Sequence, residues 1–520
     1  METIEADLVL VNSRLWTPGL TTPKRGALAV GGGRIIRSGS NEQCEGEASK
    51  DAGIIDIGGR LVVPGFVDAH AHLIHTGPRM EWLQLQEIPS LTSLLAVVAG
   101  KSRALSHGGW ILGRGWDESR WPERRFPNRS DLDGVAGKTP VLIRRVDGHM
   151  SVVNTAALRV LRIPKTTLGL EIDARGRPTG ILKEKAADLA GERTKPTVRQ
   201  LLTSFPRMIR LAHSLGITSV HDVVDERGIE AYRRLRRSGE LHLRVCMMPL
   251  IDLLPTLKPQ RSASRDPWLR SGPLKAFSDG SLGAKTAALQ SPYVDALGER
   301  GLLTYSCGEL ARAVRKAHRK GFQLAIHAIG DRAIDCVIDA FEEVLEEDAR
   351  ENHRHRIEHF ELPTDEALER CEELGIIPVM QPNFVVNWSQ PGGMYEARLG
   401  PRRTRRNNPH RLILKHGLSL AFGSDGMPYG PLFGLKGAVN PPYPSQRITL
   451  YEALEAYTLG GAFASFQEKE TGSLTPGAFA DFAVIDGDWN GDGHGLDRWR
   501  VVATIVGGEM VYKDAAMNRA

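Results

Sequence analysis

The sequence predicts an α/β fold, a (β/α)8 barrel of the TIM type, on three observations. Eight short apolar runs recur along the middle of the chain, helical patterns separate most of them, and several runs end in polar residues. Buried strands that alternate with amphipathic helices are typical of a parallel sheet covered by helices. The 520 residues are enough for one such barrel with additions.

The eight predicted strands lie between residues 61 and 426. Hydrophobic residues recur every three or four positions before the fifth strand, in 308–321, and before the sixth, in 334–351, which indicates amphipathic helices. The strands are 61–70, 216–224, 243–250, 272–280, 322–331, 354–362, 375–384 and 418–426.

The two ends of the chain differ from this middle part. Both consist of short apolar runs separated by glycines, which predicts antiparallel strands and turns. We expect residues 1–60 and 472–520 to form one composite β-sandwich domain; two unrelated hairpins are the alternative. The barrel domain then spans 61–471, and its segment from about 73 to 210 is too long for a single connection. We interpret this segment as an inserted lid or subdomain over the top of the barrel.

Composition narrows the function. The net charge of +5, with 25% charged residues, is too weak to indicate binding to nucleic acid. The first residues lack the pattern of a signal peptide, and no apolar run approaches the length of a membrane span. The odd number of cysteines and the absence of a CxxC motif predict buried thiols in a reducing compartment, so we expect a cytoplasmic protein. These cysteines are Cys44, Cys246, Cys307, Cys336 and Cys371.

Six polar residues fall in or at the ends of predicted strands. The carboxyl ends of barrel strands face one shared mouth, where such folds build their active sites. A single strand histidine is more often structural, but burying four imidazoles and a carboxylate together is costly without a ligand. Imidazole and carboxylate groups suit zinc and related divalent ions, so the set favours a metal site. Its members are His70, His72, Lys275, His327, His359 and Asp425.

The motifs around these residues resemble the amidohydrolase superfamily, and within it the YtcJ-like branch that includes N-substituted formamide deformylases. The similarity runs through nearly the whole chain, including the insertion and the last strands. The motifs are VPGFVDAHAHL, KAFSDGSLGAKTA, HAIGDRA, RIEHFEL, GSDGMP, DGHMSVVNTAAL and GSLTPGAFADFAVID.

The resemblance implies zinc or another divalent metal, one or two ions per chain. It implies that His70, His72 and Asp425 hold the first ion. It implies that His327 and His359 hold the second, and that Lys275 bridges the two as a carbamate formed with CO2.

Two other lysines could take the bridging role. Lys183 lies in the insertion, and Lys285 follows a glycine-rich loop. We favour Lys275 because it lies inside the predicted fourth strand.

The expected reaction is hydrolysis of a C–N bond in an amide, formamide or cyclic amide. A divalent ion lowers the pKa of its bound water toward neutrality, so that metal-bound hydroxide attacks the carbonyl. Asp425 would act as the general base and then as the acid. Hydrolysis of an ester, lactone or other bond on the same metal centre is the alternative, because the ligands serve both reactions. A non-catalytic binding protein is a third interpretation.

Several residues are candidate substrate contacts. In the insertion they are His149, Asn154 and Glu184, and after the fourth strand Asp279. His221 ends the second strand and faces the same mouth, but we expect it to be structural.

The basic segment 401–411 predicts a solvated loop, with an anion-binding rim as the functional alternative. We expect a small-molecule substrate, no nucleic acid and no membrane as partners. The resemblance adds the expectation of a homodimer.

Overall fold

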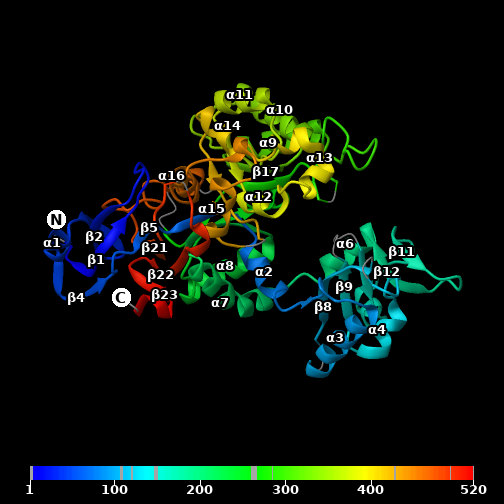
Figure 1. The fold of residues 1–520 in the computed structure, drawn as a ribbon. Coiled ribbons are helices and arrows are strands. Elements are labelled where there is room, and N and C mark those ends of the chain that lie inside the picture. Colours follow the sequence, from blue (N-terminus) through cyan, green and yellow to red (C-terminus); the bar gives the residue numbers. More distant parts are fainter. Residues whose placement is uncertain are drawn as a thin grey trace. The chain divides into compact units, whose positions relative to one another are not determined.

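The computed structural model forms two compact units (Figure 1). It describes residues 4–518 except 106–108, 119–120, 146–149, 259–265, 284, 427–428 and 492. The first unit comprises Met1–Thr76 with Leu202–Ala520, and the second comprises Gly77–Leu201. Within the described ranges, none of the helices is both long and apolar enough to cross a membrane.

In the first unit, strands from both ends of the chain form one eight-stranded sheet. The order is β23-β22-β21-β5-β1-β2-β3, and β4 also pairs with β1. The side chains of Leu28, Val62 and Phe482 pack in its core, so the first 64 residues and the last strands stabilise each other. The strands are β1 (Ala6–Leu15), β2 (Lys24–Gly31), β3 (Arg34–Gly39), β4 (Ala48–Asp56), β5 (Leu61–Pro64), β21 (Phe482–Asp486), β22 (Arg500–Val506) and β23 (Glu509–Lys513).

The middle of the chain forms two parallel sheets in the same unit. The first has the order β15-β14-β13-β6, and the second has the order β16-β17-β18-β19-β20. Their strands are β6 (Phe66–Ala71), β13 (Ile217–Val224), β14 (Arg244–Pro249), β15 (Leu269–Ser271), β16 (Leu274–Phe277), β17 (Leu324–Ala328), β18 (Arg356–His359), β19 (Ile377–Met380) and β20 (Ala421–Phe422).

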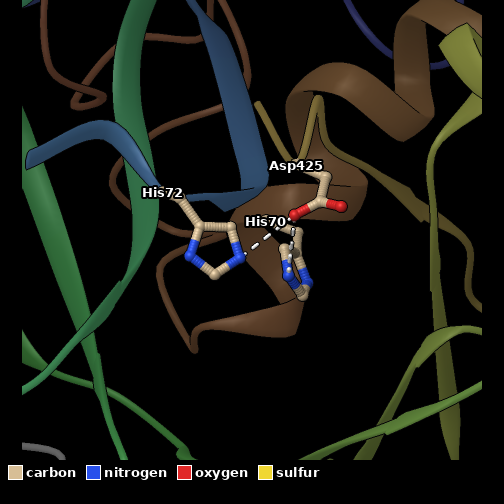
Figure 2. A group of neighbouring side chains, drawn as sticks. All are labelled: His70, His72 and Asp425. Carbon is tan, nitrogen blue, oxygen red and sulfur yellow. Dashed lines mark ion pairs between the residues drawn. The ribbon is translucent and has the colours of Figure 1, made fainter. Parts of the chain in front are cut away.

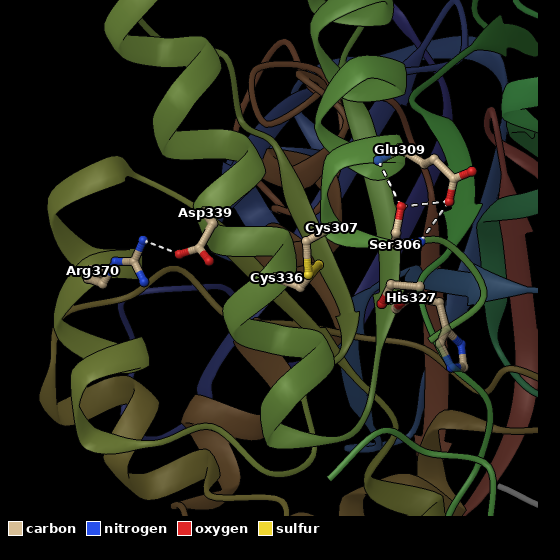
Figure 3. Close-up of a disulfide and its surroundings, with 8 residues drawn as sticks. Ser306, Cys307, Glu309, His327, Cys336, Asp339 and Arg370 are labelled. Atoms are coloured by element: carbon tan, nitrogen blue, oxygen red, sulfur yellow. Dashed lines mark hydrogen bonds and ion pairs between the residues drawn. A yellow bond between two sulfur atoms is a disulfide. The ribbon is translucent and has the colours of Figure 1, made fainter. Parts of the chain in front are cut away.

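Helices separate most of these parallel strands, so the α/β class is confirmed. α9 begins with a capping box between Ser306 and Glu309, the local signal expected at a helix start (Figure 3). The helices of the unit are α1 (Asn41–Glu45), α8 (Glu226–Ser238), α9 (Cys307–Arg319), α10 (Asp331–Glu347), α11 (Asp365–Leu374), α12 (Pro382–Trp388), α13 (Met394–Thr404), α14 (His410–Lys415), α15 (Pro431–Val439), α16 (Leu450–Glu455) and α17 (Gly461–Ala464). At the two points where the chain passes between the units lie α2 (Leu73–Arg79) and α7 (Val198–Ser214).

Two contacts connect the parallel sheets at their edges. A parallel bridge joins Leu250, just after β14, to Lys275 in β16. At the other edge, the backbone N–H of Asp425 donates to the carbonyl of His70 at 2.7 Å. The strand ends that carry the predicted ligands therefore lie on neighbouring segments.

The predicted strand 61–70 is divided in the structure. β5 belongs to the terminal sheet and β6 to the first parallel sheet, with Gly65 between them. A Cβ atom at Gly65 would lie 2.2 Å from the Thr218 hydroxyl oxygen, so glycine permits the close approach at which the chain changes sheets.

The second unit has its own six-stranded sheet, in the order β11-β12-β10-β9-β8-β7. Trp116, Trp121 and Leu132 are buried in its core. Its elements are β7 (Leu83–Gln84), α3 (Leu91–Ala104), β8 (Ile111–Trp116), α4 (Arg129–Ala136), β9 (Val141–Arg145), β10 (Met150–Val153), α5 (Thr155–Leu161), β11 (Leu170–Ile172), β12 (Pro178–Lys183) and α6 (Glu184–Arg193).

The expectation of five buried thiols is wrong for one pair. Cys307 at the start of α9 and Cys336 in α10 form a disulfide (Figure 3). They are 29 residues apart, and the packing of the two helices side by side brings them together, which their spacing in the sequence does not reveal. The other three cysteines are free and buried.

Gly423 allows the segment after β20 to reach β6. A Cβ atom there would lie 2.4 Å from the backbone nitrogen of His70, which cannot move aside as a flexible side chain could. We expect Gly423→Ala to lower the free energy of unfolding by at least about 2 kcal/mol, because overpacking forces the backbone to shift. Urea unfolding measures this. The control is Gly308→Ala, where the added methyl meets only the Arg312 guanidinium at 3.6 Å; equal stability of the two variants would contradict the prediction.

Buried histidines away from the strand ends predict acid sensitivity. Burial lowers the pKa of His410 from 6.5 to about 4, and that of His213 likewise to about 4. Between pH 6.5 and 4 the unfolded chain therefore binds more protons than the folded chain, and stability falls as the pH falls. Each such histidine accounts for a loss of about 3 kcal/mol once the pH is below 4.

We expect His410→Gln to flatten this decline in the free energy of unfolding between pH 7 and pH 4.5, measured by urea denaturation. His494→Gln is the control, because His494 is exposed. An unchanged slope in His410→Gln would refute the assignment.

Candidate metal centre

Three of the predicted ligands lie together at the end of β6 (Figure 2). The Nε2 atom of His72 is 3.1 Å from Oδ1 of Asp425, and the Nε2 atom of His70 is 3.7 Å from the same oxygen. Ligand atoms of all three residues lie within 4.8 Å of one another, a spacing that one ion can bridge. Among the described residues, no other group of three or more histidine, cysteine, aspartate or glutamate side chains has that spacing.

The backbone at the site is strained. His359 and Asp425 have positive φ angles of 75° and 58°, which non-glycine residues seldom adopt. Such conformations cost on the order of 1–3 kcal/mol each and cluster at functional sites.

His327 and His359 form a second group of imidazoles. Their ring centroids are 4.4 Å apart, and the ring of His359 is 4.9 Å from that of His70. Nε2 of His327 lies 3.0 Å from the carbonyl of Gly280, and Nδ1 of His359 lies 2.6 Å from the side-chain oxygen of Gln381. Since both partners only accept, these nitrogens carry the protons, and the opposite nitrogen of each ring keeps a lone pair for a metal.

Lys275 is fully buried in β16. Its ammonium nitrogen has no hydrogen-bond partner in the described structure and lies 4.7 Å from the Phe277 ring. Burial lowers the pKa of Lys275 to about 8. An unpartnered buried amine is rare in folded proteins.

The rival lysines have partners. Lys183 is 45% exposed and lies 3.2 Å from Glu171. Lys285 lies 3.2 Å from Asp295. Lys275 is therefore the lysine of the three that fits a metal bridge, and Nε2 of His70, also buried without a hydrogen bond, fits a metal ligand.

A family model of amidohydrolases matches residues 53–512. The chain belongs to the amidohydrolase family. The protein YtcJ of Bacillus subtilis is 31% identical over 519 residues, which cover 94% of this chain and 96% of the relative. N-substituted formamide deformylase of Arthrobacter pascens is 29% identical over 545 residues and covers 98% of both chains.

A solved metal-dependent hydrolase from Pyrococcus furiosus has the same fold. It superimposes with a TM-score of 0.79 and 29% identity, covering 92% of this chain and 99% of that one. The chain is therefore a metal-dependent hydrolase of the amidohydrolase family, and the family implies a divalent metal. Nε2 of His70 and Nζ of Lys275, both without a hydrogen-bond partner in the described part of the chain, fit that requirement.

Sequence reasoning missed two charged residues in this amidohydrolase. The Glu358 carboxylate accepts a short hydrogen bond from Nδ1 of His70, and Arg356 donates to both of its oxygens at 2.8 and 3.0 Å. Burial raises the pKa of Glu358, but Arg356 and His70 lower it further, so it stays below its usual range. The sequence offers one signal for this pair, namely two charged residues two positions apart inside a predicted buried strand.

Asp279 supports loops of the amidohydrolase through its hydrogen bonds. Its carboxylate accepts backbone N–H groups from Ala288, Ile329 and Gly330 at 2.9 to 3.1 Å. It also lies 3.3 Å from Nε2 of His327. We therefore assign it to holding the loops after β16 and β17 around that histidine.

The candidate contacts in the insertion have different outcomes. Asn154 is buried and caps α5; its side-chain oxygen accepts from Val141 and Ala157, and its amide donates to Thr139. These three hydrogen bonds to the backbone indicate a structural role. Glu184 is the first residue of α6, and His149 lies outside the described residues.

His221 is buried, and its Nδ1 atom accepts from Arg356 at 3.0 Å, which agrees with a structural role. Some residues of the basic segment 401–411 are likewise buried or hydrogen-bonded within the protein. Arg403 donates to the carbonyls of Ser291 and Pro292, and Asn407 and His410 are buried.

Proposed function

We propose that this amidohydrolase cleaves the C–N bond of an amide, formamide or cyclic amide by hydrolysis. One observation carries the proposal: the Lys275 amine is buried inside β16 without a hydrogen-bond partner among the described residues, and its charge acts on the imidazoles of His70 and His359. We further propose that eight of the nine strands in the two parallel sheets, all but the short β15, form one (β/α)8 barrel, which the bridge from Leu250 to Lys275 supports.

The residues present divide into two sets of metal ligands. His70, His72 and Asp425 would hold one divalent ion, and His327 with His359 a second. When bound, zinc or a similar ion would act as a Lewis acid and lower the pKa of water.

Lys275 would complete the site as a carbamate. Its amine, with a pKa lowered by burial to about 8, adds to CO2 and releases one proton, which leaves an anionic group with two oxygens. In that product the charge would lie on two oxygens that a divalent ion can hold, instead of on a buried ammonium that has no hydrogen-bond partner among the described residues.

Asp425 would transfer the proton in the reaction. Although burial raises the pKa of its carboxyl, the hydrogen bond from His72 and the nearby imidazoles lower it further, so it is ionised at neutral pH. It would accept a proton from the attacking water and deliver it to the leaving nitrogen.

Aromatic side chains support an apolar substrate. The Phe277 ring lies 5.5 Å from that of His327, and the Phe384 ring lies 6.1 Å from that of His359 at an angle of 9°. The ring of Trp388 lies next to that of Phe384, with ring centroids 4.8 Å apart. Together with the name of the Arthrobacter relative, these rings favour an amide with an apolar substituent on nitrogen.

The test combines metal content with paired substrates. Plasma mass spectrometry of protein purified without added metal is expected to find one or two equivalents of a divalent ion. The protein is then assayed with an aryl-substituted formamide and the formate ester of the same aryl group. Turnover of the amide supports the proposal, and turnover of the ester alone favours the alternative reaction. Absence of metal, even after incubation with zinc and bicarbonate, would overturn it.

A further inference from the structure

A fully buried ion pair lies directly behind His70. Glu358 and Arg356 are both 0% exposed and lie two residues apart in β18. We propose that Glu358, held by Arg356, is a positioning residue that fixes the ring of His70 for metal binding. The inference rests on the proposed metal centre and adds a residue that does not itself touch the ion.

The contact between Glu358 and His70 determines which nitrogen faces the site. The Oε2 atom of Glu358 meets Nδ1 of His70, and a carboxylate can only accept at that position. The proton therefore resides on Nδ1, and Nε2 presents its lone pair 3.7 Å from Oδ1 of Asp425. The anionic partner also makes the imidazole a more basic ligand.

Arg356 fixes the position of the carboxylate. Besides its two bonds to Glu358, it donates to the carbonyl of Ala69 at 2.6 Å and to Nδ1 of His221 at 3.0 Å. Ala69 belongs to β6 and His221 to β13, so one guanidinium connects three strands behind the site. Glu358 consequently has little freedom to move away from His70.

Stability alone does not account for this arrangement. Removing two charges from water costs several kcal/mol per ion, and apolar residues of similar volume often serve a core equally well. Among the described residues, the Glu358 carboxylate has one hydrogen-bond partner besides Arg356, and that partner is His70. The geometry thus assigns the pair to the metal ligand, and metal affinity is the property it should change.

The test compares Glu358→Gln with a matched buried pair elsewhere. A glutamine amide can donate to Nδ1, which permits the tautomer whose proton blocks Nε2. The control is Asp481→Asn, because Asp481 is a buried carboxylate paired with Arg244, outside the group of metal ligands. Cobalt affinity of each metal-free protein is measured by competition with a chromophoric chelator, and its thermal midpoint is recorded.

We expect Glu358→Gln to weaken cobalt binding by about 10–100-fold, and Asp481→Asn to keep wild-type affinity whatever stability it loses. Equal affinities in all three proteins would overturn the inference. If Glu358→Gln does not fold, Glu358→Asp decides, because it keeps the charge but withdraws the carboxylate: weaker cobalt binding supports the inference, and wild-type affinity refutes it. Failure of the wild type to bind cobalt would instead refute the proposed metal centre.

Discussion

Replacing Lys275 with alanine is expected to reduce turnover by at least about a thousandfold, equivalent to about 4 kcal/mol of transition-state stabilisation. The reason is the proposed bridging role, because Lys275 is buried inside β16 and its nitrogen has no hydrogen-bond partner among the described residues. Loss of the bridging group would leave His327 and His359 as the ligands of the second ion. Metal content of the purified variant should therefore fall toward one equivalent or less, measured by plasma mass spectrometry beside the steady-state kcat.

Two lysines provide matched controls for this variant. Lys183→Ala and Lys285→Ala remove side chains that make ion pairs instead of lying unpartnered in the core, so each should keep its metal and most of its turnover. In a further experiment, zinc is added back to the metal-free wild type with and without bicarbonate, and the recovery of turnover is measured. Recovery that depends on bicarbonate supports the carbamate, whereas normal metal content in Lys275→Ala would contradict the bridging role.

The strand ends were predictable because two simple physical patterns coincide there. A buried parallel strand appears as a short apolar run, and its carboxyl end is where polar side chains gather. His70, His72 and Asp425 satisfy both patterns, and the structure brings their ligand atoms within 4.8 Å. The break at Gly65 was not predictable in this way, because it depends on contact with Thr218, which is distant in the sequence.

Polar residues whose partners are backbone atoms were the hardest to interpret. Asp279 and Asn154 have the chemistry of substrate contacts, but loops and a helix start supply their hydrogen bonds. Which backbone N–H groups surround a side chain depends on loop conformation, and a single sequence does not encode this in a readable spacing. Glu358 is the opposite case, since a charge inside an apolar strand indicates a buried partner.

Asp425→Asn separates proton transfer from metal binding. The asparagine side chain keeps an oxygen near Nε2 of His72, at the position where Oδ1 of Asp425 lies 3.1 Å away, so part of the metal affinity should remain. An amide cannot accept the proton of the attacking water, and loss of a general base costs about 10²–10⁴-fold in rate. We therefore expect kcat to fall by that factor while metal content stays above that of Asp425→Ala, which removes the ligand oxygen as well.

The comparison of the two variants makes the result specific to Asp425. If Asp425→Asn and Asp425→Ala lost metal equally, the fall in kcat would reflect the loss of the metal and not the loss of a general base. If Asp425→Asn kept near wild-type kcat with its metal in place, another group would have to accept the proton, and the role of Asp425 would reduce to that of a ligand. The positive φ of Asp425 fits both roles, because a ligand and a base each need a carboxylate oxygen held in a fixed direction. The hydrogen bond from its backbone N–H to the carbonyl of His70 holds it in that single conformation.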